Sequence, residues 1–224
     1  MHIGDGFLSP ETVAVSYGVA IPLWWYSLKR LKRELNEETL PLLGGLSGLS
    51  FIIMMFNIPI PGGTSGHPVG VALIALLFNP YIAFIAVSIV LLVQALIFGD
   101  GGISAWAVNS LAMGFIAGYS ARWIFDRLKE TKLGKFAPFV AGWFSLVTAS
   151  LFVGFVLGIQ PYFGVDSHGH PLYFPFGLKV AIPAMVIPHT LFFGVVEGLF
   201  TQLIYNFLTE KRWAPSLNRE GKNG

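Results

Sequence analysis

Hydrophobic residues occur along the chain in long runs that are separated by short polar segments. These runs cover approximately residues 7–28, 40–56, 68–98, 103–124, 136–158 and 178–207. One crossing of a bilayer takes about 20 mostly apolar residues, so most runs predict one transmembrane helix each. The run 68–98 could form one tilted helix or two helices broken at Asn79-Pro80, and periodicity alone does not decide between them. The pattern therefore predicts an all-α, polytopic membrane protein.

The basic residues decide how often the run 68–98 crosses. If it crosses twice, all fourteen lysines and arginines except Lys179 fall on one side, and the positive-inside rule makes this side cytoplasmic. We therefore expect about seven transmembrane helices in the cell membrane, with the N-terminus outside and the C-terminus in the cytoplasm. The third crossing, about residues 68–78, is too short to span alone, so we expect the loop before it to dip into the protein.

Composition agrees with a membrane protein and narrows the possible chemistry. Of the 224 residues 54% are hydrophobic and 12% are charged, as in a membrane protein. A chain of this length has no room for a soluble domain beside seven transmembrane helices. We expect one transmembrane substrate-binding domain over residues 1–224. The net charge is only +2, and the basic residues cluster at a few loops, a pattern that indicates membrane orientation rather than nucleic-acid binding, so we expect no nucleic-acid partner. Because the chain has no cysteine, any bound metal must have nitrogen or oxygen ligands.

The first six residues, Met1-His2-Ile3-Gly4-Asp5-Gly6, lie directly before the first helix. The α-amine of Met1, the deprotonated backbone nitrogen of His2 and the imidazole Nδ1 of His2 can close adjacent five- and six-membered chelate rings. Three nitrogens in one plane suit Ni²⁺ or Cu²⁺, whereas Mg²⁺ and Ca²⁺ prefer oxygen cages. No basic residue precedes the first run, so we expect no cleaved signal peptide and a free Met1. Residues 1–6 are thus predicted to be a metal-chelating segment.

A fourth nitrogen could come from His67, which ends the glycine-rich loop 62–67 on the same side of the membrane. The alternative is that His67 merely caps the short third helix and that His2 is an ordinary exposed residue. Two of only five histidines lie on one face, and one of them occupies the position at which a free amino terminus can chelate. We therefore predict a four-nitrogen square-planar site made by Met1, His2 and His67.

Polar residues should support such a site, because a metal-bound imidazole usually donates its second nitrogen to an oxygen. The candidates are Asp5, Ser65, Gln94 and Asn109. Asp5 could instead cap the first helix. The side-chain amides of Gln94 and Asn109 could simply join helices by hydrogen bonds. Asp100, in the sequence Gly-Asp-Gly-Gly, is interpreted as a turn residue.

Other ionisable residues have less defined roles. Glu197 lies deep in the last run, where a charge is costly, so it should be paired or face an aqueous or partner surface. His189 could pair with polar groups at a proline kink, and metal contact is the weaker alternative. Asp166, His168 and His170 are interpreted as a solvated outer loop rather than an ion-collecting entrance.

Several of these segments together resemble the CbiM/NikM family, the cobalt- or nickel-specific substrate-binding (S) components of energy-coupling-factor (ECF) transporters. The similar stretches are residues 1–8, the loop 63–67, residues 91–102 and Asn109. The resemblance implies a seven-helix fold with an external N-terminus, an N-terminal segment inserted into the protein, and Met1, His2 and His67 as ligands. The chain departs from the family pattern at Gly4 and in the loop 166–170.

The resemblance also implies partners. The chain has no Gly-xxxx-Gly-Lys-Ser/Thr loop with which it could bind ATP, so energy must come from elsewhere. By resemblance, a membrane coupling (T) subunit, a pair of ATPase subunits and a small auxiliary membrane protein would supply it. Ni²⁺ or Co²⁺ would be transported substrate, no resident cofactor is expected, and the chain itself is not expected to be an enzyme. Both metals stay open, since the intrinsic affinity of nitrogen ligands follows Cu²⁺ over Ni²⁺ over Co²⁺.

Two alternative functions belong to other classes of protein. The sequence Gly63-Thr64-Ser65-Gly66 fits a Gly-x-Ser-Gly pattern, and His189 lies in a later helix, as in a rhomboid-like intramembrane serine protease. A vitamin-binding subunit of the same transporter class is the other alternative, although nothing in the sequence requires an organic ligand.

Overall fold

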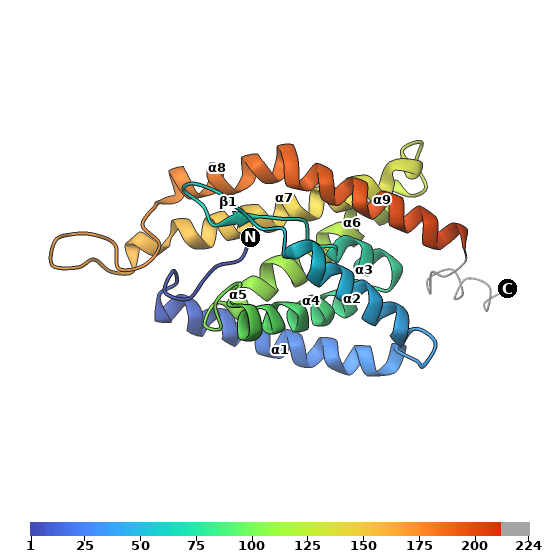
Figure 1. Cartoon of the computed structure of the whole chain (residues 1–224), viewed down its shortest axis with the longest axis horizontal. Helices are drawn as coiled ribbons and strands as arrows, with labels where there is room; N and C mark the ends of the chain where they lie inside the picture. Colours follow the sequence, from blue (N-terminus) through green and yellow to red (C-terminus); the bar gives the residue numbers. More distant parts are fainter. Residues whose placement is uncertain (212–224) are drawn as a thin grey trace.

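The computed structural model describes residues 1–211, so Arg212 and the basic residues after it lie outside the described part of the chain. The described chain is an elongated bundle whose longer helices run roughly along its long axis (Figure 1). The α-helices are α1 (Pro10–Glu34), α2 (Leu40–Met54), α3 (Val71–Leu77), α4 (Pro80–Val93), α5 (Trp106–Ser110), α6 (Ala117–Leu128), α7 (Ala137–Gly158), α8 (Leu178–Pro188) and α9 (Gly194–Glu210). Two short strands, β1 (Ile58–Pro59) and β2 (Ser65–Gly66), form an antiparallel hairpin.

Short turns of other helix types extend or join these helices. Three are π-helical, namely η1 (Gln94–Phe98), η2 (Leu111–Ile116) and η5 (His189–Phe193), and two are 3₁₀, namely η3 (Gly134–Phe136) and η4 (Gln160–Tyr162). The turns η2 and η5 make α5–α6 and α8–α9 two continuous helical rods, which correspond to the predicted runs 103–124 and 178–207. The sequence did not predict the π turns, because one extra residue in a turn leaves the hydrophobic pattern almost unchanged.

The predicted break in the run 68–98 is confirmed. The Asn79 side chain accepts a hydrogen bond from the Ile82 N–H, and Pro80 occupies the first helical position, so α4 begins here. The preceding helix, α3, has only seven residues, and all of them are buried. The end of the loop that leads to α3, residues 66–70, is buried except for the half-buried Pro68, as the shortness of that crossing predicts.

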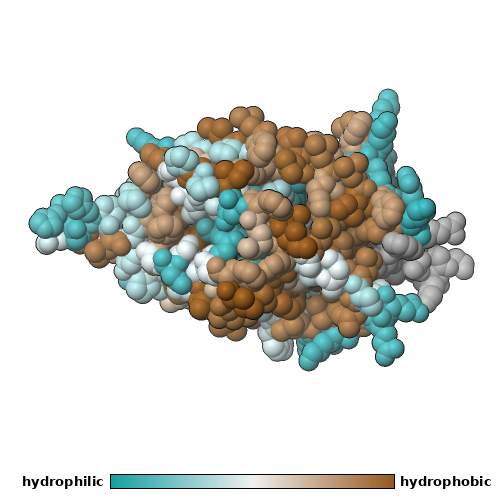
Figure 2. Space-filling view, in the orientation of Figure 1, coloured by the Kyte–Doolittle hydropathy of each residue, from teal (hydrophilic) through white to brown (hydrophobic). Residues whose placement is uncertain are grey.

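The hydropathy of the surface agrees with a membrane protein. Within residues 1–211, three helical segments are long and apolar enough to cross a bilayer, namely Pro80–Phe98, Gly134–Tyr162 and Leu178–Glu210. Figure 2 shows hydrophobic residues over the middle of the molecule and hydrophilic residues gathered toward its two ends. This distribution is that of a protein whose sides contact lipid and whose ends contact water.

Helix α7 packs against α6, α8 and α9, and α3 lies against α6, α7 and α9. Glycines let α7 approach its neighbours closely: a Cβ at Gly142 would lie 2.8 Å from the Glu197 carbonyl oxygen, and one at Gly154 would lie 2.9 Å from the Ile182 Cα. Small residues of this kind allow backbone-to-backbone packing between membrane helices. This packing fixes α9 beside the loop that carries His67.

The N-terminal segment, residues 1–9, runs from the start of α1 into the bundle, so that the chain begins near β1 (Figure 1). Ser9 caps α1, because its side chain accepts a hydrogen bond from the Thr12 N–H. The alternative that Asp5 caps this helix is therefore wrong.

Candidate metal centre

The first three residues are enclosed by the protein. Met1 and Ile3 are fully buried, and His2 is 6% exposed. Asn109 holds the backbone of Ile3 from both sides, since its Oδ1 accepts from the Ile3 N–H (3.0 Å) and its Nδ2 donates to the Ile3 carbonyl (3.0 Å). The Gly102 N–H also donates to the Ile3 carbonyl (2.9 Å). The amino terminus is thus fixed in place by backbone pairing as well as by burial.

The loop before α5 approaches this segment very closely. A Cβ at Gly102 would lie 2.4 Å from the Asp5 backbone nitrogen, so glycine is required there. The Asp5 carboxylate accepts hydrogen bonds from the Ser104 hydroxyl and from the backbone N–H groups of Ser104 (2.8 Å) and Ile103 (3.2 Å), and these bonds lower its pKa. Asp5 therefore secures the segment at its outer end and does not touch the imidazoles.

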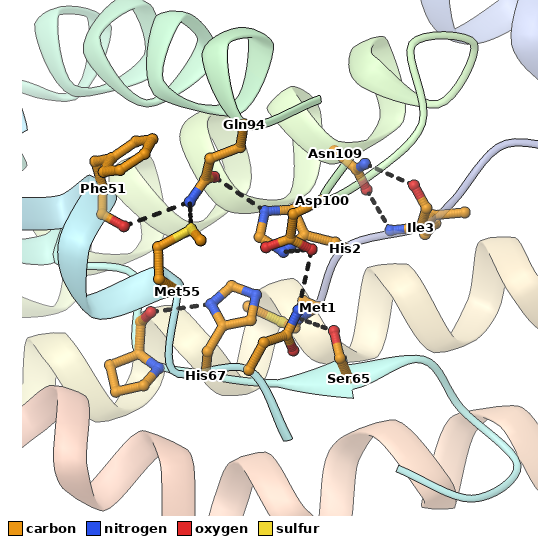
Figure 3. A network of polar contacts seen from close by, with 12 residues as sticks. Met1, His2, Ile3, Phe51, Met55, Ser65, His67, Gln94, Asp100 and Asn109 are labelled. Atoms are coloured by element: carbon orange, nitrogen blue, oxygen red, sulfur yellow. Dashed lines mark hydrogen bonds and ion pairs between the residues drawn. The ribbon is translucent and has the colours of Figure 1, made fainter. Parts of the chain in front are cut away.

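The structure brings Met1, His2 and His67 together (Figure 3). The rings of His2 and His67 stack with their centroids 4.6 Å apart. The Met1 amine donates a hydrogen bond to the Ser65 Oγ (3.2 Å). Burial lowers the pKa of this amine well below its usual value, although the charge of Asp100 opposes the shift. A neutral amine carries the lone pair that a metal ion requires.

Hydrogen bonding decides which nitrogen of His2 is free. The His2 Nε2 lies 3.2 Å from the Gln94 Oε1, while the Gln94 amide nitrogen faces the Phe51 carbonyl (3.4 Å). This arrangement assigns the ring proton to Nε2, which donates it to Gln94, and leaves a lone pair on Nδ1. Burial lowers the pKa of His2 to about 3, with a smaller contribution from the charge of the Met1 amine, so the ring is neutral near pH 7.

Asp100 lies directly opposite the free nitrogen of His2. Its Oδ1 is 3.3 Å from the His2 Nδ1 and also accepts a hydrogen bond from the Asn57 amide (3.0 Å). A lone pair and a carboxylate repel each other at this distance, and a cation between them would remove the repulsion. Asp100 is indeed a turn residue, between Gly99 (φ 66°) and Gly101 (φ 84°), but the sequence interpretation missed its side chain. A carboxylate a few residues from Gln94 was the available signal.

His67 has the hydrogen-bonding pattern of a metal-binding imidazole. Its Nδ1 donates to the Pro68 carbonyl (3.0 Å), and its Nε2 is buried without a hydrogen-bond partner. Burial lowers the pKa of His67 well below its usual value, and the charges of the Met1 amine and of His2 add to this effect. A histidine that donates one nitrogen to a carbonyl and leaves the other free is oriented for a metal ion. The alternative of a helix cap is wrong, because the residue that caps α3 is Gly70.

Side chains alone do not complete a metal site here. Within residues 1–211, no group of three or more histidine, aspartate or glutamate side chains is arranged to hold a metal ion. The terminal amine and the backbone nitrogen of His2 are the further donors that this centre offers.

The other candidates fall into two groups. Ser65 and Gln94 contact Met1 and His2 directly, whereas Asn109 and Asp5 hold the backbone of the N-terminal segment. The exposed loop that holds His170, whose ring lies 3.3 Å from a carboxylate oxygen of Asp166, is separate from this centre.

Glu197 is fully buried on α9 and has backbone partners rather than a cation. It accepts from the Val69 N–H (2.7 Å) and from the Gly70 N–H (3.0 and 2.9 Å to its two oxygens). Of the expected environments, pairing or an aqueous or partner surface, the structure shows a partnered carboxylate whose partners are backbone N–H groups. Its partners follow His67 by two and three residues, so Glu197 holds the loop that presents the imidazole.

Comparisons with known proteins identify metal transport proteins that are similar to this chain. Residues 2–215 match the family model CbiM, described as "Cobalt uptake substrate-specific transmembrane region". The chain is 41% identical over 221 residues to the "Probable fused nickel transport protein LarMN" of Lactiplantibacillus plantarum, covering 96% of this chain and 66% of that protein. It is 40% identical over 206 residues to the "Fused nickel transport protein NikMN" of Rhodobacter capsulatus, covering 90% of this chain and 59% of that protein. The chain thus spans less than two thirds of these two relatives.

One solved structure, a crystal structure of a truncated transition metal transporter, has a TM-score of 0.91 and 39% sequence identity to this chain, covering 94% of this chain and 99% of that one. The "Putative metal transport protein MJ1569" of Methanocaldococcus jannaschii is 39% identical over 214 residues, which are 95% of this chain and 93% of that protein. The chain matches these proteins in sequence and in fold along nearly its whole length. It therefore belongs to the CbiM family of cobalt uptake substrate-specific transmembrane regions.

Proposed function

We propose that the chain captures Ni²⁺ or Co²⁺ outside the cell membrane and delivers it inward as the S component of an ATP-driven ECF transporter. The observation that carries this proposal is a buried amino terminus beside two imidazoles, each with an unpartnered nitrogen. Relatives named as nickel or cobalt transport proteins support the choice of metals.

The proposed ligands are the Met1 amine, the His2 backbone nitrogen, the His2 Nδ1 and the His67 Nε2. Three of these four nitrogens already carry a free lone pair, because burial favours the neutral amine and the neutral imidazoles. Only the His2 amide has to lose a proton when the ion binds. Asp100 then faces the bound cation and supplies a second negative charge beside that of the deprotonated His2 amide.

The topology in the membrane belongs to the same proposal. Residues 1–224 form one transmembrane domain with seven crossings, and residues 1–6 are its metal-chelating segment. The N-terminus lies outside and the C-terminus lies in the cytoplasm, which the distribution of lysines and arginines supports. A coupling subunit, a pair of ATPase subunits and a small auxiliary membrane protein use ATP to reorient the chain, since tight binding alone would retain the ion.

The test is metal analysis of purified protein that keeps its native N-terminus. Wild type is expected to retain stoichiometric Ni²⁺ or Co²⁺ through purification, whereas His2→Ala and His67→Ala are expected to bind so much more weakly that they lose the ion during purification. One residue added before Met1 should abolish binding, because it removes the amine from the chelate, whereas a C-terminal tag should not. A full complement of metal in both histidine variants, or equal binding by the two tagged forms, would refute the ligand assignment.

The two alternative functions gain no support. The Ser65 hydroxyl accepts a hydrogen bond from the Met1 amine, and the His189 Nδ1 donates to the Met185 carbonyl, so these two side chains are not paired as nucleophile and base. A vitamin-binding role likewise has no observation in its favour.

A further inference from the structure

His189 lies outside the proposed four-nitrogen plane, yet it shares the features of His67. It is fully buried, its Nδ1 donates to a backbone carbonyl, that of Met185 (2.6 Å), and its Nε2 has no hydrogen-bond partner. This hydrogen bond places the ring proton on Nδ1 and leaves the lone pair on Nε2. An unpaired buried polar atom destabilises the fold, so a purely structural histidine would be expected to use this nitrogen.

The contacts of neighbouring residues locate His189 beside the proposed site. Residues four positions away lie on the same face of a helix. On one side, the Met185 sulfur accepts a hydrogen bond from the Thr64 N–H (3.4 Å). On the other side, the Phe193 ring packs so tightly on Gly66 that a Cβ there would lie 1.9 Å from it. His189 lies between these two contacts, with its ring 5.2 Å from that of Phe193.

Sequence proximity agrees with this position, because Thr64 and Gly66, which Met185 and Phe193 contact, lie within three residues of His67. The backbone here is also adjustable. The π turn η5 begins at His189, directly after Pro188, which lacks an N–H and weakens the helix at this point. A small change in this turn would move the ring toward or away from the chelate.

We propose that the His189 Nε2 is a further ligand for the transported ion and binds it when the four-nitrogen chelate opens. This inference rests on the proposed function. When the chelate opens, the bond between the metal and the His2 amide nitrogen breaks, and that nitrogen regains a proton from water. The lone pair of the His189 Nε2 then forms a new bond to the ion, whose charge and oxidation state do not change. An exchange of ligands of this kind lowers the barrier to release from a tight site.

The test opens the chelate by mutation and measures whether the His189 nitrogen contributes to the Ni²⁺ binding that remains. Ni²⁺ affinity is measured by calorimetry on full-length protein with a native N-terminus, for wild type, His2→Ala and the double variant His2→Ala/His189→Ala. The matched control is His2→Ala/His170→Ala, which removes an exposed histidine far from the centre. We expect the His189 substitution to weaken the residual binding of His2→Ala by about tenfold or more, and the His170 substitution to leave it unchanged.

A second variant and a second readout exclude a merely structural effect. His189→Asn keeps a side-chain N–H donor for the Met185 carbonyl but lacks the imidazole nitrogen, so it should behave like His189→Ala. Pulsed EPR of bound Cu²⁺ counts coordinated imidazoles, and in a background without His168 and His170 the count for His2→Ala should fall by one when His189 is replaced.

The outcomes separate this proposal from the proposed function. If wild type binds Ni²⁺ tightly but His2→Ala, His2→Ala/His189→Ala and His2→Ala/His189→Asn bind it with equal affinity, this proposal alone is overturned. An unchanged imidazole count has the same meaning. If wild type itself does not bind Ni²⁺, the proposed function fails and this proposal fails with it.

Discussion

Glu197 should control metal affinity although it does not belong to the proposed ligands. Its carboxylate accepts the backbone N–H groups of Val69 and Gly70, and the preceding Pro68 carbonyl accepts the Nδ1–H of His67. A continuous set of hydrogen bonds therefore runs from α9 to the imidazole. We predict that Glu197→Gln lets this loop shift and misaligns the His67 Nε2.

The geometry gives the size of the effect. Glutamine keeps one acceptor oxygen and replaces the other by an NH₂ group, which cannot accept from a backbone N–H. One buried N–H then shares its acceptor or loses it, at a cost of about 1–3 kcal/mol in the free energy of unfolding. Loss of a group that orients a ligand typically lowers metal affinity about 10- to 100-fold. This range corresponds to about 1.4–2.8 kcal/mol of binding free energy.

Calorimetric titration with Ni²⁺ in detergent measures the affinity, and the absorption spectrum of the bound ion reports its geometry. Glu210→Gln is the matched control, because Glu210 is exposed at the end of the same helix. This control should bind like wild type. Wild-type affinity and an unchanged spectrum in Glu197→Gln would refute the reasoning, since they would show that His67 keeps its orientation without the carboxylate.

Three further predictions concern the N-terminal segment and its contacts. Gly102→Ala places a Cβ 2.4 Å from a backbone nitrogen of the segment, so metal binding should be lost while circular dichroism stays helical; Gly4→Ala, with open space around its Cβ, should bind normally. Gln94→Leu removes the acceptor that fixes the tautomer of His2, and calorimetry should show about 10- to 100-fold weaker Ni²⁺ binding, an expectation that equal affinity would contradict. Ser65→Ala removes one hydrogen bond to the amine and should leave cellular metal uptake largely intact; complete loss of uptake would show that this hydrogen bond is required for the site.

The sequence by itself determined most of the helical architecture. Long apolar runs must become helices in lipid, because a backbone without water has to satisfy its own hydrogen bonds. The break at Asn79-Pro80 was also readable, since proline and an N-capping side chain act locally. The same locality explains why Met1 and His2 could be proposed as ligands from the sequence, since chelation by an amino terminus and the next histidine depends on adjacent atoms. His67 was proposed from its predicted side of the membrane and from the family resemblance.

Only the tertiary structure decided which distant groups meet these residues. Asp100 meets His2 because the N-terminal segment lies against the loop before α5. Glu197 meets the loop after His67, and Met185 beside His189 meets Thr64, because α8 and α9 pack against α7 and α9 packs against α3. Helix packing of this kind is set by small differences in shape along apolar faces, and hydrophobic periodicity does not record them. Hydrogen bonding within the packed fold also decided which imidazole nitrogens stay free, because the sequence gives the ring but not its neighbours.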